Sequence, residues 1–211
     1  MKMKLLRNLL NERYAKNAAK FMRIVCYLVM LFFALCLILS FMGRQTFRLH
    51  TSTGTYDDAI YAEEDHEWTS RGMVVHMSDD DVYVWANDDD QIDLSIQIAL
   101  SLMFAFSVVP LIFAFWFLSR VFTNISKGQI FTEQNALCLL YYGLIQFFAA
   151  ILVPFIKLLI AHIVNLFADG RVSLSTGRGM LEGIIPSIAF IVAAYIIHYG
   201  IHLQDEVDHT L

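Results

Sequence analysis

Four uninterrupted apolar stretches constrain this chain more than any other feature of its sequence. They cover residues 24–42, 94–118, 136–156 and 184–201, and the first three contain no charged residue. A helix needs about 20 consecutive, mostly apolar residues to cross the hydrocarbon core of a bilayer. The sequence therefore predicts an all-α membrane protein with four transmembrane helices.

The overall composition agrees with this fold class. Hydrophobic residues make up 57% of the chain and charged residues 17%, whereas soluble domains are about half apolar and about a quarter charged. The net charge of −5 does not favour direct binding of nucleic acid. The first apolar stretch is longer than a signal-peptide core of about 7–15 residues and lacks a small-x-small cleavage site, so we expect a retained helix.

Positive charge near the spans predicts their orientation. Only Glu12 opposes the basic residues of the first 23 positions, which are Lys2, Lys4, Arg7, Arg13, Lys16, Lys20 and Arg23. Because Lys and Arg are enriched on the cytoplasmic side, we expect both termini and residues 119–135 to lie in the cytoplasm. Residues 43–93 and 168–183 then lie outside, although Lys157, Arg171 and Arg178 weakly favour the opposite orientation.

The basic N-terminal segment, residues 1–23, has a helical repeat of apolar residues. Leu5, Leu6, Leu9, Leu10 and Tyr14 alternate with Lys and Arg, a pattern typical of an amphipathic helix lying in the headgroup layer. We interpret this segment as a topology anchor, with a docking site for an acidic partner as the alternative.

Local sequence patterns predict the structure of both outer loops. In the acidic loop 43–93, the β-rich runs 72–77 and 81–86 flank a Ser-Asp-Asp turn and predict a small hairpin near residues 72–86. A lone hairpin is marginal in water, so it is expected to pack on the membrane surface, on other loop residues or on a partner. The second outer loop, 168–183, is rich in Gly and small polar residues and is expected to be flexible.

The cytoplasmic segment 119–135 has the local signals of a tight elbow. We expect the second helix to continue through Phe122 and Ile125 and to end at Gly128, a residue suited to a helix C-cap. Thr132 is a good N-cap for the third helix, which we expect to reach about residue 167 before Asp169-Gly170. Ile130 and Phe131 lie between the two caps.

Three other groups of polar residues could bind a ligand or could have only a structural role. The acids Asp79–Asp81, Asp88–Asp90 and Asp93 could bind a cation but lack EF-hand spacing, so a solvated acidic face is favoured. His198 and His202, four residues apart, could bind a metal, but two ligands do not make a site. Gln146 is expected to form an interhelical hydrogen bond. Cys26, Cys36 and Cys138 are expected to be buried hydrophobes.

Two stretches resemble a known family. Residues 122–135 read FTNISKGQIFTEQN and resemble the F-x-N-I-x-K-G-x-x-F-T-x-x-N elbow of a bacterial family of small four-span membrane proteins of unknown function, DUF2975. Residues 203–211, LQDEVDHTL, resemble that family's acidic terminus. Ile130 stands where Pro often precedes the Phe, His209 stands where Leu is usual, and no Arg follows Asn135. The resemblance extends over essentially the whole chain in the order of its spans.

The resemblance implies a bacterial cytoplasmic-membrane protein that is often encoded beside a very small helix-turn-helix DNA-binding protein. By association, this suggests a non-enzymatic membrane regulator or sensor that holds such a partner in the cytoplasm. The partner-binding candidates are Asn124, Lys127, Gly128, Phe131, Thr132 and Asn135 in the elbow and Asp205, Glu206, Asp208 and Thr210 in the tail 202–211.

Other functions remain open. They are an immunity or envelope-stress protein, an accessory transporter subunit, and a membrane enzyme assembled from distant residues such as His162, Asp169 and Glu182. No nucleotide-binding loop, hydrolase motif or zinc spacing is present in the sequence. We therefore predict no catalytic, cofactor or metal residues. The expected partners are the lipid bilayer, the small DNA-binding protein and a second copy of the chain.

Overall fold

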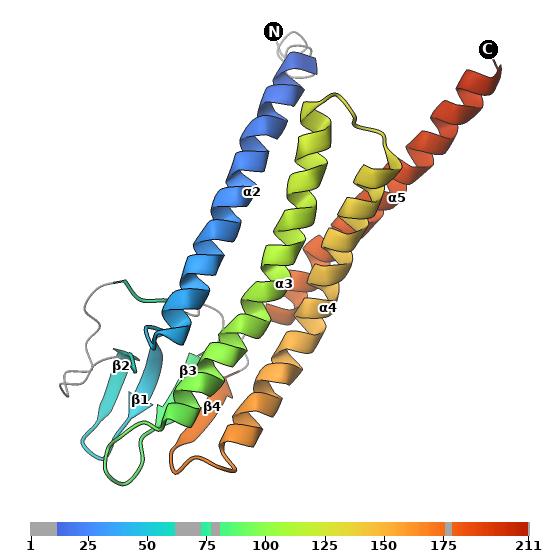
Figure 1. Cartoon of the computed structure of the whole chain (residues 1–211). Helices are drawn as coiled ribbons and strands as arrows, with labels where there is room; N and C mark the ends of the chain where they lie inside the picture. Colours follow the sequence, from blue (N-terminus) through green and yellow to red (C-terminus); the bar gives the residue numbers. More distant parts are fainter. Residues whose placement is uncertain (1–11, 62–72, 77–80, 176–178, 211) are drawn as a thin grey trace, which may run out of the picture. The chain divides into compact units, whose positions relative to one another are not determined.

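Four long helices and a small four-stranded sheet form the described part of the chain (Figure 1). The computed structural model describes residues 12–61, 73–76, 81–175 and 179–210. The helices are α2 (Glu12–Phe41), α3 (Leu94–Ser126), α4 (Glu133–Val164) and α5 (Gly179–Thr210). The strands are β1 (Phe47–His50), β2 (Thr55–Ala59), β3 (Asp81–Trp85) and β4 (Arg171–Ser175).

Each of the four predicted spans falls within a long apolar helix. The helical segments Tyr14–Phe41, Leu94–Ser126, Glu133–Val164 and Gly183–Leu203 are each long and apolar enough to cross a membrane. This indicates a membrane location. The helices are longer than the apolar stretches. The 33 residues of α3 span about 50 Å, whereas the hydrocarbon core of a bilayer is about 30 Å thick.

The additional helical turns lie at positions that the sequence analysis had assigned to other segments. Residues 12–23 of the expected interfacial helix are continuous with the first span in α2, whereas residues 1–11 lie outside the described residues. Helix α5 continues through most of the expected tail, to Thr210. Helix α4 ends at Val164, and turns follow it through Phe167.

The predicted hairpin near residues 72–86 is wrong. Strand β3 pairs in parallel with β1 and antiparallel with β4, so both of its edges are occupied in the sheet order β2-β1-β3-β4. Val75, in the other half of the expected hairpin, instead forms an isolated bridge with Gln45. The alternating pattern correctly predicts β3 as a strand. The assumption that it pairs with the nearest β-rich run in the sequence is wrong. A small mixed sheet therefore replaces the hairpin in the fold class.

The expectation of a flexible loop at residues 168–183 is also wrong over Arg171–Ser175, which form the edge strand β4. The side chain of Asn165 binds the Val172 backbone twice: its Nδ2 donates to the carbonyl at 2.8 Å, and its Oδ1 accepts from the amide at 2.8 Å. A side chain thus occupies backbone groups that a free edge would expose to another strand.

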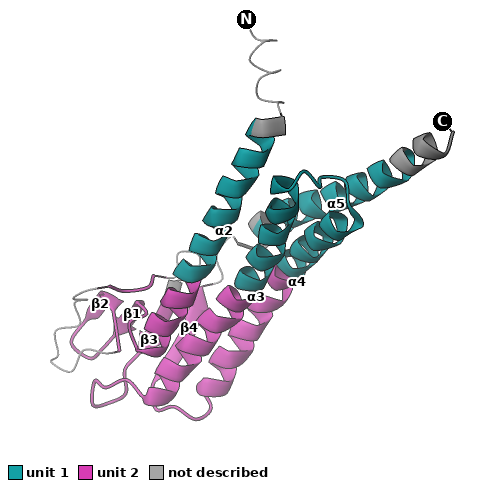
Figure 2. Ribbon diagram, turned by 45° about the horizontal axis from the view of Figure 1, so that its top comes forward, with its two compact units in different colours: residues 1–32, 110–148, 183–211 teal, residues 33–109, 149–182 magenta. Residues whose placement is uncertain are grey.

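The chain divides into two compact units, coloured separately in Figure 2. Unit 1 comprises residues 1–32, 110–148 and 183–211, and its core contains Cys26, Leu118, Val121, Cys138, Leu139 and Ala194. All four helices contribute to this core. Cys26 and Cys138 are free and buried, as is Cys36 in the other unit, which confirms the interpretation of the cysteines.

Unit 2 comprises residues 33–109 and 149–182 and contains the sheet. One face of the sheet packs on helical residues of this unit. The core combines Phe47, Leu49, Val82, Val84 and Val172 of the strands with Ile96, Ala99, Leu100, Met103, Ala161 and Val164 of α3 and α4. The sheet therefore covers the beginning of α3 and the end of α4.

Candidate functional site

A hydrogen-bonded polar constellation in unit 1 forms the elbow between α3 and α4, residues 124–135. The end of α3 is closed by two reversed backbone hydrogen bonds, from Gly128 to the Ile125 carbonyl at 2.9 Å and from Gln129 to the Asn124 carbonyl at 3.0 Å. This pair of bonds defines a Schellman motif. Gly128 has φ 87, a left-handed conformation that strongly favours glycine. The predicted C-cap is confirmed.

The start of α4 is capped as the sequence predicted. The Thr132 hydroxyl accepts a hydrogen bond from the backbone amide of Asn135 at 3.3 Å. This is the N-cap to N3 bond that satisfies one of the free amides at a helix start. The two caps fix the backbone on both sides of residues 129–131.

A buried amide then locks the segment between the caps. Asn135 is 0% exposed, and its Nδ2 donates to the carbonyls of Gln129 at 2.7 Å and Ile130 at 2.9 Å. Its Oδ1 accepts from Nδ2 of Asn124 at 2.8 Å. The side chain thus uses both of its donors and one acceptor position inside the elbow. We call this arrangement the Asn135 latch.

The latch divides the candidate elbow residues into two groups. The amides of Asn124 and Asn135 are engaged within the elbow, and Gly128 and Thr132 act as helix caps. The apolar side chains of Ile130 and Phe131 instead remain 41% and 56% exposed, and Lys127 is exposed as well. The chain therefore uses buried hydrogen bonds to hold a loop that displays two large apolar side chains.

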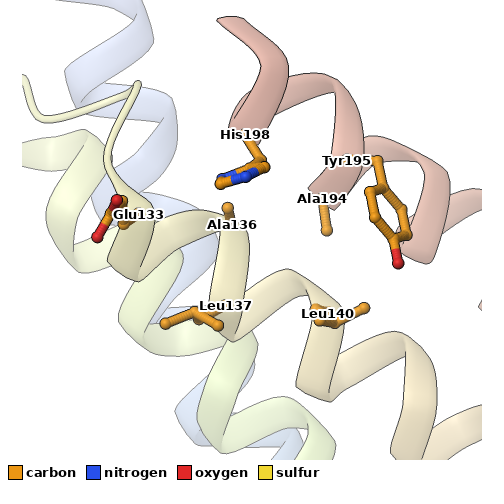
Figure 3. A pocket seen from close by; sticks show the side chains of 7 residues that line it. All are labelled: Glu133, Ala136, Leu137, Leu140, Ala194, Tyr195 and His198. Carbon is orange, nitrogen blue, oxygen red and sulfur yellow. The ribbon is translucent and has the colours of Figure 1, made fainter. Parts of the chain in front are cut away.

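A groove lies next to the elbow, between the first turns of α4 and the C-terminal half of α5 (Figure 3). Its volume is about 340 Å³, and its lining residues are Glu133, Ala136, Leu137, Leu140, Ala194, Tyr195 and His198. Phe131 reaches the same helix pair: a Cβ added at Gly200 would lie 3.5 Å from Cδ1 of its ring. The elbow and the groove thus form one surface within unit 1.

The rim of the groove carries the polar groups. Glu133 begins α4, and His198 projects from α5 (Figure 3). The rings of His198 and His202 pack edge to face with centroids 4.8 Å apart. Among the described residues, no group of three or more His, Cys, Asp or Glu side chains could hold a metal ion.

In unit 2, two of the acids considered as cation ligands bind backbone or hydroxyl groups. Oδ2 of Asp93 accepts from the amides of Asp169 at 2.9 Å and Gly170 at 3.3 Å. Asp90 accepts from the Ser52 amide at 2.7 Å and from the Ser52 hydroxyl. These two donors hold the pKa of the Asp90 carboxyl below its ordinary value. The Asp90 contact joins two parts of the loop 43–93, and the Asp93 contacts join this loop to residues 169–170.

The structure describes no site formed by the remaining candidate residues. The side chains of the tail candidates, Asp205, Glu206, Asp208 and Thr210, lie outside the described residues, as does that of Glu182. His162 and Asp169 are exposed. The expected interhelical bond of Gln146 is absent, because its buried Nε2 has no hydrogen-bond partner in the described parts of the chain.

Sequence reasoning found the elbow but missed the groove. The groove depends on the pairing of α4 with α5, whose contributing residues are about 60 positions apart. One sequence signal could have indicated this pairing. A Cβ at Gly143 would lie 2.7 Å from Cγ1 of Ile191 and 3.0 Å from the Ser187 carbonyl, so a small residue is needed where the two helices approach.

Comparison with known proteins identifies a family but no characterised relative. Residues 58–211 match the family model described as "Protein of unknown function (DUF2975)". This stretch contains the elbow, the groove and three of the four spans. No curated protein and no solved structure gives a significant match.

Proposed function

The chain belongs to this family of unknown function, and we propose that it is a non-enzymatic regulator of the bacterial cytoplasmic membrane. In this proposal both termini and the elbow face the cytoplasm, as the distribution of Lys and Arg predicts. The elbow and the adjacent groove hold a small helix-turn-helix DNA-binding protein at the membrane. Release of that protein would then change transcription.

The observation that carries the proposal is the latched elbow with its exposed apolar side chains. Phe131 is more than half exposed on a backbone segment fixed by the Asn135 latch. Aromatic residues that stand on rigid backbone are typical anchors of protein interfaces, because little conformational freedom is lost when they bind.

The groove supplies a second contact for the same partner. Its floor is apolar, with Leu137, Leu140 and Ala194, and its rim carries Glu133 and His198. An amphipathic helix binds such a groove by inserting apolar side chains at helical spacing. Phe131 beside the groove would pack against the flank of the inserted helix.

The test measures whether the partner is retained with the membrane. The chain is co-expressed with the epitope-tagged DNA-binding protein encoded beside its gene, and the tagged protein is quantified in washed membranes. We expect Phe131→Asp to lower recovery by at least about tenfold, since loss of an interface anchor costs about 2 kcal/mol or more. Leu137→Trp, which fills the groove, is expected to lower recovery as well.

Two matched variants control for changes of charge and size. Gln129→Asp introduces the same charge at an exposed position of the same elbow, and Leu152→Trp enlarges an exposed leucine of α4 that does not line the groove. Both are expected to retain the partner. Equal recovery with Phe131→Asp and wild type, or the absence of any DNA-binding protein encoded beside this gene, would refute the proposal.

A further inference from the structure

The solvent face of the sheet in unit 2 gathers aromatic and basic side chains that the proposed regulator function does not use. Strand alternation directs Phe47, Leu49, Val82, Val84 and Val172 into the core. The residues between them therefore share the opposite face: Arg48, His50, Tyr83, Trp85, Arg171 and Ser173. We call this set the aromatic face.

Cross-strand register arranges these side chains in two rows. Trp85 pairs with His50 on one side and with Arg171 on the other, while Tyr83 pairs with Arg48 and with Ser173. The His50 and Trp85 rings are stacked with centroids 5.1 Å apart, and those of His50 and Tyr83 lie 6.0 Å apart. Trp85 remains 37% exposed. A continuous aromatic surface thus lies across β1 and β3, with Arg171 at its margin.

The polar groups of this face are fixed by neighbouring side chains. Nε of Arg48 donates to Oδ1 of Asp57 at 2.6 Å, its Nη1 donates to the Tyr83 hydroxyl at 3.0 Å, and its guanidinium lies over the Tyr83 ring. Strand β2 contains a bulge at which Asp58 has a φ of 60°. The bulge places two residues of β2 opposite Arg48, and Asp57 is one of them. Nδ1 of His50 lies 2.9 Å from the Thr55 hydroxyl.

Arg171 differs from Arg48 in its surroundings. It is exposed, and none of the described acidic side chains forms an ion pair with it. Register places it directly opposite Trp85. The face therefore offers an aromatic ring beside a guanidinium that no described carboxylate binds, and Arg binds carboxylates through two parallel hydrogen bonds.

The face lies at the end of unit 2 where α3 begins. A Cβ at Gly170 would lie 2.7 Å from the Trp85 carbonyl and 2.8 Å from Cδ1 of Ile96, so Trp85 adjoins the first turn of α3. The core-facing residues of this end of α3, Ile96 to Met103, are covered by the sheet. Trp85 is exposed on the opposite side of the sheet from this core and is therefore accessible to a ligand.

We infer that the aromatic face binds an acidic saccharide. The face of the Trp85 ring that is not stacked on His50 would pack on the apolar C–H face of a pyranose, and the Arg171 guanidinium would bind a carboxylate on that sugar or on the next one. His50 and the Arg48–Asp57 pair would meet the ring hydroxyls. Sugars interact weakly with each group, so a face whose side chains are already fixed suits them.

The inference extends beyond the proposed regulator function, since it supplies a ligand for the opposite side of the membrane. Binding is measured on the full chain purified in detergent, so that the result does not depend on orientation or on any DNA-binding partner. The probes are two soluble oligosaccharides of equal length: alternating N-acetylglucosamine and N-acetylmuramic acid, which carries carboxylates, and neutral N-acetylglucosamine. Isothermal titration calorimetry reports the affinity of each.

We expect saturable binding with preference for the acidic oligosaccharide. Trp85→Ala should weaken binding of both probes by about tenfold or more, and Trp85→Phe should weaken it less because a ring is retained. Arg171→Gln should reduce binding of the acidic probe and leave the neutral one unchanged. Trp85→Phe and Arg171→Gln keep the strand pairing, so their effects do not depend on the stability of the sheet.

The chain offers a matched control in a second pair of the same residue types. In unit 1 the guanidinium of Arg120 lies 4.0 Å from the Trp116 ring centroid, and both side chains are exposed. Trp116→Ala and Arg120→Gln should leave both affinities unchanged. Three results would overturn the inference: no saturable binding, equal affinity for the acidic and neutral probes, or equal losses with the Trp116 and Trp85 variants.

Discussion

Substitution of Asn135 by Ala should release the elbow while leaving both helices in place. The variant removes three hydrogen bonds: two from Nδ2 to the carbonyls of Gln129 and Ile130 and one from Asn124 to Oδ1. Each hydrogen bond contributes about 0.5–1.5 kcal/mol net. Because water can reach carbonyls at this surface, we take the lower part of the summed range and expect local opening to become easier by about 2 kcal/mol.

Hydrogen exchange measures this opening directly. The amides of Gly128 and Gln129 are bonded to carbonyls of α3, and their exchange reports the free energy of local opening. A change of about 2 kcal/mol corresponds to an exchange rate faster by about 30-fold. Asn124→Ala removes only one of the three bonds and should accelerate exchange by about fivefold.

The amide of Val172 provides an internal control, because its bond to Asn165 lies in unit 2. Its exchange rate should be the same in wild type and in both variants. The reasoning about the Asn135 latch would be refuted by unchanged exchange at Gly128 and Gln129 in the Asn135→Ala protein. Equal acceleration by the two variants would also contradict it, because the latch argument assigns two of the three bonds to Nδ2 of Asn135.

Three further predictions concern close contacts and charge. Gly170→Ala should destabilise the protein by about 1–3 kcal/mol, because its Cβ would clash with the Trp85 carbonyl, whereas Gly54→Ala, with no atom within 4 Å, should leave the thermal midpoint unchanged. Gly143→Leu should lower the thermal midpoint further than Gly143→Ala, since α5 backbone lies 3.0 Å from the Cβ position. The stability from the Asp90–Ser52 contact should be fully present at pH values above the ordinary Asp pKa. It should be lost as the pH falls through the lower Asp90 pKa of the folded state. Ser52→Ala should raise the Asp90 pKa in an NMR titration.

The elbow could be predicted from sequence because all of its determinants are local. Gly128 and Thr132 are within eight residues of the groups that they cap. Gly128 acts through its left-handed backbone conformation, and Thr132 acts through its hydroxyl. The role of Asn135 was less accessible. Its amide was expected to face a partner, whereas burial directs it into the elbow. Residue type alone does not indicate which way an Asn side chain is directed.

The sheet could not be predicted in the same way, because its pairings are distant in sequence. Strand β3 was recognised from its alternation, but its neighbours come from residues 47–50 and 171–175, on either side of two helices. Local hairpin reasoning favours the nearest β-rich run. The groove between α4 and α5 has the same origin, since its lining residues are distant in sequence.

The central claim is that the exposed Phe131 of the latched elbow contacts a small DNA-binding protein on the cytoplasmic side. The most direct measurement replaces Phe131 with a photoreactive phenylalanine analogue in living cells, with the analogue at Gln129 for comparison. We predict that irradiation joins position 131 to the small DNA-binding protein encoded beside the gene, and that position 129 gives much less of this product. Crosslinks from position 131 to lipid alone, or no crosslink to that protein, would contradict the account.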